Sequence, residues 1–323
     1  METKAMKKVL ISLSIITLLV FLIPFHSQAV DKYWIDGTSW WDYSSNWSPV
    51  GQPQNGDNVY LTQSDATNRT VYYWNTLYPS AVLSLLKIDA TGTGTMTLSQ
   101  GKDPLASYDE YIGYSGTGTF KQTGGTNTVT NTLTIAATPG SSGTYDLSGG
   151  ILTAYNIVNN DTFNQSGGTI NGPLQNNKTF NYSGGIFNGR LINNGVANFN
   201  ADFTAGNGME QNTDLTIPSG ITIALNGQGL DNQGSITLAG GTWGGTGPLV
   251  NNGLITGFGT ITGSGGFTNT WLLKHSDGNL ILANTGTNTN YGSIILAGAP
   301  YRFEIQGAEG IKPEEAAIWL PLF

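Results

Sequence analysis

The chain has 323 residues with 45 Gly and no Cys, and only 11% of its residues are charged, against roughly 25% in an ordinary globular domain. Its 8 Trp, 14 Tyr and 12 Phe exclude a typical disordered chain, which is poor in aromatic residues. The formal net charge of −8 argues against nucleic acid as a partner, because phosphates need a basic surface. Without cysteine the fold receives no help from disulfides.

The first 29 residues are predicted to be a signal peptide that is removed on export. Lysines within residues 4–8 precede an apolar segment over residues 9–25, and Ser27-Gln28-Ala29 has the small-x-small pattern of a cleavage site. The apolar segment is short and has polar interruptions, which disfavours an uncleaved anchor across a bilayer of about 30 Å. The mature chain is expected to begin at Val30, to have no direct membrane span and to be extracellular or associated with the bacterial outer membrane.

Residues 30–110 are predicted to form a Trp-rich N-terminal cap and the first strands. Trp34, Trp40, Trp41 and Trp47 precede a turn rich in Pro and Gly. Such rings can cover the strand edge that the end of a stack would otherwise expose. The segment AVLSLLKI from Ala81 fits a short helix or a strand, and we expect a strand.

Internal repetition indicates the fold of the next segment. Asparagine pairs recur 17 residues apart, starting at Asn159, Asn176 and Asn193, in the segments NNDTFNQSGGTINGPLQ and NNKTFNYSGGIFNGRLI and in a shorter third copy. A period this short fits one coil of a β-solenoid and is too small for a helix pair or a propeller blade. Residues 111–298 are therefore predicted to be β-solenoid repeats.

Like residues of successive coils should form columns with a step of about 4.8 Å. The repeat predicts three inward apolar columns: Phe120, Tyr145, Phe163, Phe180 and Ile236 in the first, Leu152, Ile170, Phe187 and Trp243 in the second, and Leu174 and Leu191 in the third.

Asn159, Asn176 and Asn193 are predicted to form a further column, in which each side-chain amide bonds the amide of the next coil. We expect these residues at corners of the coil, because asparagine tolerates the left-handed backbone region. Pairs of glycine also fit corners, where a positive φ excludes a Cβ, and they lie at residues 124–125, 149–150, 167–168, 184–185, 240–241 and 265–266.

Three segments carry a family resemblance. SWWDYSSNWSPVGQPQNGDNVYL from Ser39 resembles the opening of autotransporter-associated β-strand-repeat proteins, in which a Trp-rich stretch, Asn-Trp-Ser, a Pro and Gly-Asp precede the first strand. IGYSGTGTFKQTGGTNTVTNTLTI from Ile112 and GSSGTYDLSGGILT from Gly140 resemble the repeats of the same exported, autotransporter passenger-like proteins. The resemblance implies an all-β, right-handed, single-stranded parallel β-helix with a surface or matrix role and no catalytic residues.

The repeat pattern is lost after Gly298. Residues 299–323 are predicted to be a C-terminal tail or a truncated cap, and the segment IKPEEAAIWLPLF from Ile311 fits a short amphipathic helix.

A β-helix enzyme that acts on polysaccharides needs paired carboxylates, or a basic residue beside bound calcium. The acids of the repeat region fall at unrelated repeat positions, and Asp146 and Asp161 are interpreted as solvated side chains. Asp109 and Glu110 are adjacent in sequence, so their side chains should leave opposite faces of a strand. The tyrosines on either side of this pair are compatible with a platform for a sugar.

His275 is the one histidine of the mature chain, and without a second His or a Cys it favours neither a catalytic triad nor a zinc site. We interpret it as a surface residue, and we expect no cofactor and no metal. Threonine runs such as TNTVTNTLT from Thr126 are also found in ice-binding or carbohydrate-binding faces, but outward threonine is common in strands, and these threonines hold no single register.

The sequence therefore predicts an exported, non-catalytic β-solenoid with a structural, adhesin-like or extracellular-matrix role. Surface glycans or other cell-surface proteins are the expected partners. The alternatives are a polysaccharide lyase or glycoside hydrolase built on a β-helix, and a carbohydrate-binding module.

Overall fold

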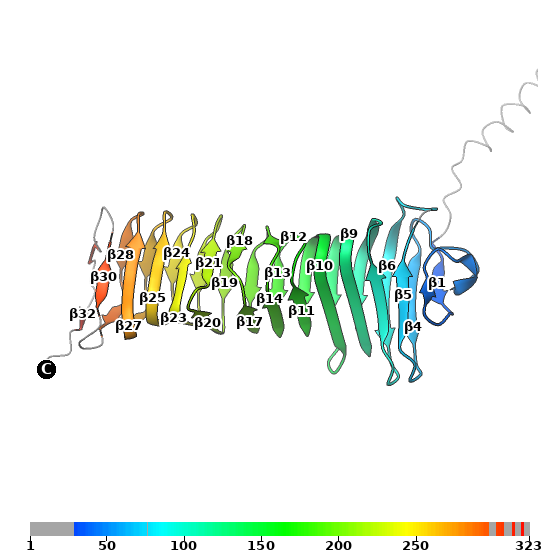
Figure 1. Ribbon diagram of the computed structural model, residues 1–323, viewed down its shortest axis with the longest axis horizontal. Coiled ribbons are helices and arrows are strands. Elements are labelled where there is room, and N and C mark those ends of the chain that lie inside the picture. Colours follow the sequence, from blue (N-terminus) through cyan, green and yellow to red (C-terminus); the bar gives the residue numbers. More distant parts are fainter. Residues whose placement is uncertain (1–28, 76, 297–301, 307–311, 314–317, 320–323) are drawn as a thin grey trace, which may run out of the picture.

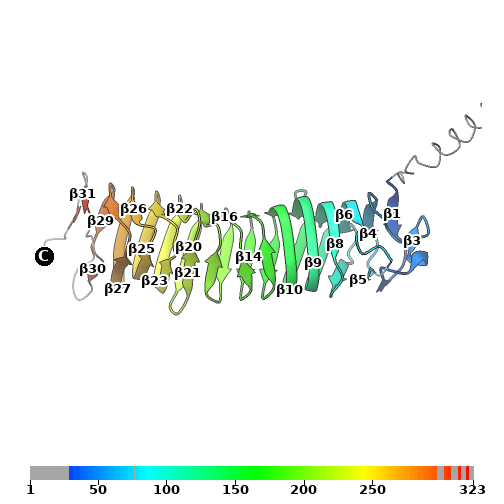
Figure 2. The same ribbon diagram turned by 90° about the horizontal axis from the view of Figure 1, so that it is seen from above.

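The computed structural model describes residues 29–75, 77–296, 302–306, 312–313 and 318–319, so the predicted signal peptide lies almost entirely outside the described residues. The described chain forms an elongated rod of stacked strands, with β1 (Asp31–Trp34) at one end and β32 (Ile318–Trp319) at the other (Figure 1). A view turned by 90° shows the same single stack (Figure 2).

The strands fall into three groups along the rod. The N-terminal group consists of β1, β2 (Ser39–Trp40), the 3-10 helix η1 (Ser44–Asn46), β3 (Trp47–Ser48), β4 (Asn58–Gln63), β5 (Arg69–Tyr73), β6 (Val82–Ala90), β7 (Met96–Gln100), β8 (Leu105–Ile112), β9 (Thr117–Ile135) and β10 (Ser142–Asn159). The central group consists of β11 (Thr162–Gln165), β12 (Thr169–Asn171), β13 (Leu174–Asn176), β14 (Thr179–Tyr182), β15 (Ile186–Phe187), β16 (Leu191–Asn193), β17 (Val196–Phe199), β18 (Phe203–Ala205), β19 (Met209–Gln211), β20 (Asp214–Pro218), β21 (Thr222–Leu225) and β22 (Leu230–Asn232). The C-terminal group consists of β23 (Ser235–Gly244), β24 (Leu249–Asn251), β25 (Leu254–Gly263), β26 (Phe267–Asn269), β27 (Leu272–Asn284), β28 (Asn288–Asn290), β29 (Ser293–Ile295), β30 (Phe303–Ile305), β31 (Lys312–Pro313) and β32.

Each coil has three sides, and each side pairs in parallel with the same side of the next coil. In the central coils β11, β12 and β13 supply one strand to each side and pair with β14, β15 and β16. We call these side B (β11), side C (β12) and side A (β13). The longest strands, β9 and β10, run around the corners and pair along all three sides. The predicted parallel β-solenoid is thus confirmed, and the segment from Ala81 forms strand β6 as expected.

Alternating side chains explain why these short segments form strands. In β11 the sequence TFNQ places Phe163 and Gln165 inside and leaves Thr162 and Asn164 half-buried on the outside. This period of two is that of a strand with one buried face.

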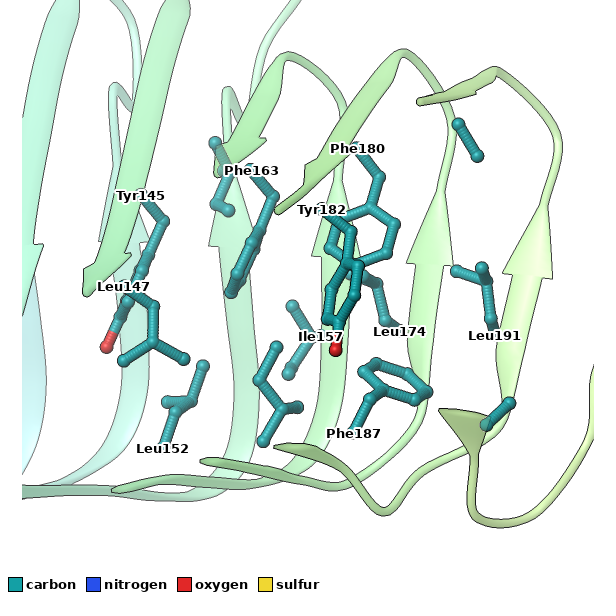
Figure 3. Close-up of a cluster of buried hydrophobic side chains, with 14 of the residues drawn as sticks. Tyr145, Leu147, Leu152, Ile157, Phe163, Leu174, Phe180, Tyr182, Phe187 and Leu191 are labelled. Atoms are coloured by element: carbon teal, nitrogen blue, oxygen red, sulfur yellow. The ribbon is translucent and has the colours of Figure 1, made fainter. Parts of the chain in front are cut away.

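Aromatic rings fill the interior of side B. Phe120, Tyr145, Phe163 and Phe180 pair in register in successive coils, and all four are buried. The ring centroids of Tyr145 lie 4.8 Å from Phe120 and 5.0 Å from Phe163 in stacked pairs, whereas Phe163 and Phe180 meet edge to face at 6.0 Å (Figure 3). The next coil has the smaller Ala197 at this position.

The apolar columns of sides C and A lie opposite these rings (Figure 3). Ile170 pairs with Phe187 on side C, and Leu174 pairs with Leu191 on side A. Beyond Phe187 the paired residue is Ala205. The prediction that Trp243 continues this column is wrong. Trp243 pairs with Ile223, and Ile223 pairs with Phe203. Phe203 lies two positions before Ala205, so Trp243 belongs to a neighbouring column on the same side.

A ladder of side-chain amides runs along the inside of side A. Asn159 Nδ2 donates to Asn176 Oδ1 at 2.8 Å, and Asn176 Nδ2 donates to Asn193 Oδ1 at 2.7 Å. The same register position is taken up in the following coils by Gln211, Asn232, Asn251, Asn269 and Asn290. These residues are buried, so we call them the amide ladder.

The amide ladder also ties side A to side B. Asn159 Nδ2 donates to the carbonyl oxygen of Thr179, and Asn176 Nδ2 to that of Val196, each at the start of a side B strand. The predicted left-handed backbone at these asparagines is wrong, since no asparagine among the described residues has a positive φ. The reason is that each ladder residue ends a strand with its amide pointing inward, and the corner begins one residue later.

Glycine pairs form corners, as the sequence predicts: five of the six lie between sides B and C, and the pair at residues 265–266 lies between side C and side A. Each of the six pairs contains at least one residue with a positive φ. At Gly168 φ is +65°, and an added Cβ would lie 2.9 Å from the carbonyl oxygen of Gly150 in the coil before. A side chain at this corner would therefore clash with the backbone of the neighbouring coil.

The N-terminal end is closed by a cluster of tryptophans. Trp34 and Trp41 both pack edge to face against Trp47, with ring centroids 5.1 and 4.7 Å apart, and all three rings are buried. Trp40 does not take part in this cover as predicted, because it is 40% exposed on the outer surface.

The C-terminal strands pair in parallel like the others. β31 pairs with β28, and β32 pairs with β29. The amphipathic helix predicted for residues 311–323 is therefore wrong at these four residues, and the other residues of that segment lie outside the described part of the chain. Within the described ranges no helix is long and apolar enough to cross a membrane.

The aromatic column of side B provides a test of the core. Phe180→Asp places an unpaired charge among buried rings, and we expect it to lower the free energy of unfolding by more than about 4 kcal/mol. Val196→Asp is the control, because Val196 lies exposed on the next strand of the same side. Denaturant unfolding measures both variants, and equal stabilities would contradict the column.

The amide ladder provides a second test. Asn176→Ala removes the donor to Asn193 and the acceptor of Asn159, and we expect a loss of about 1–3 kcal/mol for each group left unpaired. Asn194→Ala is a matched change at an exposed asparagine and should change stability by no more than about 0.5 kcal/mol. Thermal or denaturant unfolding of both variants checks the difference.

Candidate functional site

A column of outward side chains crosses the first coils on side A. Tyr33 of β1, Tyr60 of β4, Lys87 of β6 and Tyr111 of β8 pair in register. The rings of Tyr33 and Tyr60 are stacked, with centroids 4.9 Å apart and planes 13° apart. Lys87 Nζ lies 4.0 Å from the ring centroid of Tyr114, which meets Tyr111 edge to face at 5.3 Å.

A groove of about 460 Å³ lies along this column. We call it the tyrosine groove, and it is lined by Tyr33, Tyr60, Thr62, Gln63, Ser64, Lys87, Asp89, Thr91 and Ser115. Its lining combines aromatic rings with hydroxyl, amide and amino groups. A concave surface with a few convergent polar groups is the usual form of a site for a small ligand.

Asp89 fixes the far wall of the tyrosine groove. Its carboxylate is buried and accepts hydrogen bonds from the backbone N–H of Ser115 at 3.1 Å, from the Ser115 hydroxyl at 2.9 Å and from the N–H of Gly116 at 2.8 Å. Lys87 Nζ lies 3.6 Å from the same carboxylate. Asp89 therefore positions both Lys87 and the loop that carries Tyr114.

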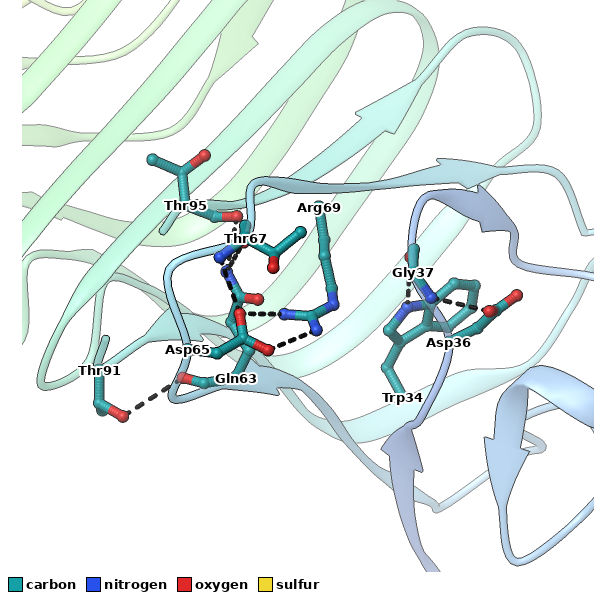
Figure 4. A network of polar contacts seen from close by, with 9 residues as sticks. All are labelled: Trp34, Asp36, Gly37, Gln63, Asp65, Thr67, Arg69, Thr91 and Thr95. Carbon is teal, nitrogen blue, oxygen red and sulfur yellow. Dashed lines mark hydrogen bonds and ion pairs between the residues drawn. The ribbon is translucent and has the colours of Figure 1, made fainter. Parts of the chain in front are cut away.

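A second polar network holds the loop between β4 and β5 (Figure 4). Arg69 donates to both carboxylate oxygens of Asp65, at 2.8 and 2.6 Å, and these bonds lower the pKa of Asp65. Gln63 Nε2 donates to the carbonyl oxygens of Thr67 and Thr95, and the Thr91 hydroxyl donates to the carbonyl of Gln63. Two residues that line the groove are thereby fixed in place.

The phenol groups of Tyr60 in the tyrosine groove and of Tyr111 in the same column stay protonated at neutral pH. Partial burial, the Asp31 carboxylate and Tyr33 raise the pKa of Tyr60, and partial burial, Asp109 and Tyr114 raise that of Tyr111. Each phenol can therefore donate a hydrogen bond, while its ring offers a flat apolar face. This combination suits a sugar, which has C–H groups on the face of its ring and hydroxyl groups at the edge.

The predicted site residues form the structural columns described above and lie inside the rod. Phe163, Phe180, Ile170, Phe187, Leu174 and Leu191 are buried, as are the three ladder asparagines, so none of them can meet a ligand. The residues of the tyrosine groove were missed, apart from the suggestion of a sugar platform beside Tyr111. Their spacing is irregular in sequence, and only the register of the strands brings them together.

The acids differ from their sequence interpretation. Asp161 is buried, not solvated: it forms an ion pair with Lys178 and accepts hydrogen bonds from Ser142 and Gly143. Burial acts to raise its pKa, but these partners hold the pKa below its usual value. Asp146 is half-buried and accepts a hydrogen bond from Asn164 at 2.7 Å.

Glu210 and Asp231 do not lie at unrelated positions, because they pair in register on side A. Glu210 accepts hydrogen bonds from Arg190 and Asn212. Asp231 accepts hydrogen bonds from Gln233 and Asn252.

One further interpretation is wrong, because His275 is buried in β27 and not at the surface. The threonine run from Thr126 forms no column across the coils, since Thr126 pairs with Ile151 and Thr134 with Val158. A different set of threonines, on side B, does hold one register over six coils and consists of Thr70, Thr97, Thr119, Thr144, Thr162 and Thr179. The single-sequence spacing hid this column because the coils differ in length.

A polar cluster lies inside the coils next to the tyrosine groove. Asn127 Nδ2 donates to Glu110 Oε2 at 2.9 Å and contacts the Tyr145 hydroxyl at 3.3 Å, and Tyr145 donates to Gln122 Oε1 at 2.6 Å. Burial raises the pKa of Glu110 from 4.5 to about 8, and the hydrogen bond from Asn127 offsets only part of this shift. Glu110 is therefore a neutral acid in the folded chain at pH 7.

Comparison of the chain with protein-family models, curated proteins and solved structures gave no match. Among the described residues no group of three or more His, Cys, Asp or Glu side chains is placed to hold a metal ion.

Glu110 predicts a pH dependence of stability. The pKa of Glu110 in the folded chain, about 8, lies above the usual 4.5. Binding of a proton to this carboxyl group therefore stabilises the folded state. The stabilisation is complete below pH 4.5 and is lost as the pH rises toward 8, by at most about 1.4 kcal/mol per pH unit. Denaturant unfolding at pH 5 and pH 8 should show this loss in the native chain and a smaller one in Glu110→Gln. Equal losses in both chains would contradict the assignment.

Proposed function

We propose that this chain is an exported, non-catalytic β-solenoid that binds neutral glycans at the cell surface through the tyrosine groove. The observation that carries the proposal is the groove itself, in which the stacked Tyr33 and Tyr60 and the side chain of Lys87 stand in register on one side of the solenoid. The predicted signal peptide and the resemblance of the sequence to autotransporter-associated repeat proteins support an extracellular or outer-membrane location.

The charge of the tyrosine groove favours an uncharged ligand. Lys87 is paired with Asp89 and with the ring of Tyr114, so its positive charge is already balanced. Hydroxyl groups of a neutral sugar can bond to the groove without removing a charge from water. Stacking of the sugar on Tyr60 and Tyr33 would supply apolar contact.

The enzyme alternative rests on Glu210 and Asp231. Two carboxylates that stand on neighbouring strands fit the close spacing of a retaining glycoside hydrolase. Both carboxylates, however, already accept hydrogen bonds from neighbouring side chains. Glu210 accepts from Arg190 and Asn212, and Asp231 accepts from Gln233 and Asn252. A retaining glycoside hydrolase needs both carboxyl groups free to reach the scissile bond, so we favour binding over catalysis.

Binding to a panel of soluble neutral and acidic polysaccharides tests the proposal. We expect saturable binding of a neutral polymer by the mature chain, and a loss of affinity of about tenfold in Tyr60→Ala, the equivalent of about 1.4 kcal/mol. Tyr155→Ala is the matched control, because Tyr155 is 77% exposed and lies on β10, outside the groove lining. Equal affinities of the two variants would refute the assignment of the groove.

The same panel separates binding from catalysis. Chain length and reducing ends of each polymer are measured after incubation with the native chain and with a Glu210→Gln, Asp231→Asn double variant. We expect no cleavage by either chain. Cleavage by the native chain that the double variant lacks would establish the enzyme alternative.

A further inference from the structure

A second exposed aromatic surface lies on side B. Trp40 of β2 pairs in register with Tyr72 of β5, and their ring centroids are 5.1 Å apart. Trp74 follows β5 and meets Trp40 edge to face at 5.7 Å. These three rings are 39–40% exposed, so they are accessible although they pack against one another.

One lysine contacts these rings, and a second lies two strands further along the same column. Lys102 Nζ lies 4.2 Å from the ring centroid of Trp74. Tyr72 pairs with Ser99, which pairs with Lys121, so the outward column runs from Trp40 to Lys121. We call Trp40, Tyr72, Trp74, Lys102 and Lys121 the tryptophan-lysine stripe.

The lysines of the stripe have no ion pair among the described residues. Four other cations, Arg69, Lys87, Lys178 and Arg190, each form an ion pair with a carboxylate. Asp146 pairs in register with Lys121, but it accepts a hydrogen bond from Asn164 and forms no ion pair among the described residues. Two lysines without an ion pair therefore lie on the same side as three exposed rings, in a chain of net charge −8.

The stripe is held in a fixed shape. Asp103 Oδ2 accepts a hydrogen bond from the N–H of Asn75 at 3.1 Å, which joins the loop of Lys102 to the loop of Trp74. Asn75 Nδ2 also donates to the carbonyl of Tyr78 at 2.8 Å. Three steps of about 4.8 Å separate Trp40 from Lys121, so the stripe spans roughly 14 Å along the rod.

From this arrangement we infer that the tryptophan-lysine stripe binds an acidic glycan that carries a carboxylate on its sugar rings. The exposed rings stack on the faces of the sugars, and Lys102 and Lys121 neutralise the carboxylates. This site lies on side B, whereas the tyrosine groove lies on side A and suits a neutral glycan. One chain can therefore hold two glycans of different charge at once.

Polygalacturonate and its fully methyl-esterified form test the inference, because the two polymers share a backbone and differ in charge. We expect the full mature chain to bind polygalacturonate at least tenfold more tightly than the ester. Lys102→Gln with Lys121→Gln should abolish this preference and flatten the dependence of the affinity on salt concentration. Trp74→Ala should weaken binding of polygalacturonate about tenfold.

The control variant is Trp271→Ala, since Trp271 is 65% exposed near the opposite end of the rod. Melting temperatures of all variants establish that they fold. The inference is overturned if the native chain does not bind polygalacturonate, if it binds both polymers equally, or if Trp74→Ala and Trp271→Ala behave alike. Tyr60→Ala should keep its affinity for polygalacturonate, which separates this site from the tyrosine groove.

Discussion

Buried amides fix the register of the coils. A side-chain amide inside the rod must find partners, because an unpaired polar group in the interior costs about 1–3 kcal/mol. Asn159, Asn176 and Asn193 meet this requirement only when they lie directly above one another. A slip by one residue would turn the amides outward and bring the outer side chains into the core. The ladder therefore determines which residues lie outside as well as which lie inside.

Parallel backbone pairing sets the register in every coil, including those without the ladder, and it explains how a chain with few charged residues builds the surfaces that we propose to bind glycans. Backbone pairing with the coils on either side fixes the position of each outward residue. Side chains that are far apart in sequence therefore form a column with a regular spacing between coils. Tyr33, Tyr60 and Lys87 come from three different coils, and Trp40, Tyr72 and Lys121 likewise belong to one column. The backbone pairing holds them rigidly, which lowers the entropic cost of binding a ligand.

The sequence predicts the fold well wherever the coil length is constant. Phe163, Phe180 and the asparagines recur every 17 residues, so their columns can be read directly from the sequence. The outward surfaces lie in coils of unequal length, where Tyr33 pairs with Tyr60 and Tyr60 with Lys87 only because of the observed register. The burial of His275 and Asp161, and the pairing of Glu210 with Asp231, depend on the same register. The spacing of residues in a single sequence does not reveal which residues of neighbouring coils are paired.

The interior of the rod changes between its two ends. In the coils that carry both aromatic surfaces, the position of the amide ladder is occupied by Leu61, Ile88, Ile112 and Ile135, and the buried polar groups include Glu110, Gln122 and Asn127. From Asn159 to Asn290 amides occupy that position in each coil. The ladder is interrupted once, where Gln211 Nε2 donates to Thr213 of its own coil and Asn232 Oδ1 receives no donor from the described residues. The amide-paired coils therefore extend the rod away from the coils that present the aromatic rings. Such a division fits the proposed function, because it holds the end with the proposed glycan sites at a distance from the opposite end.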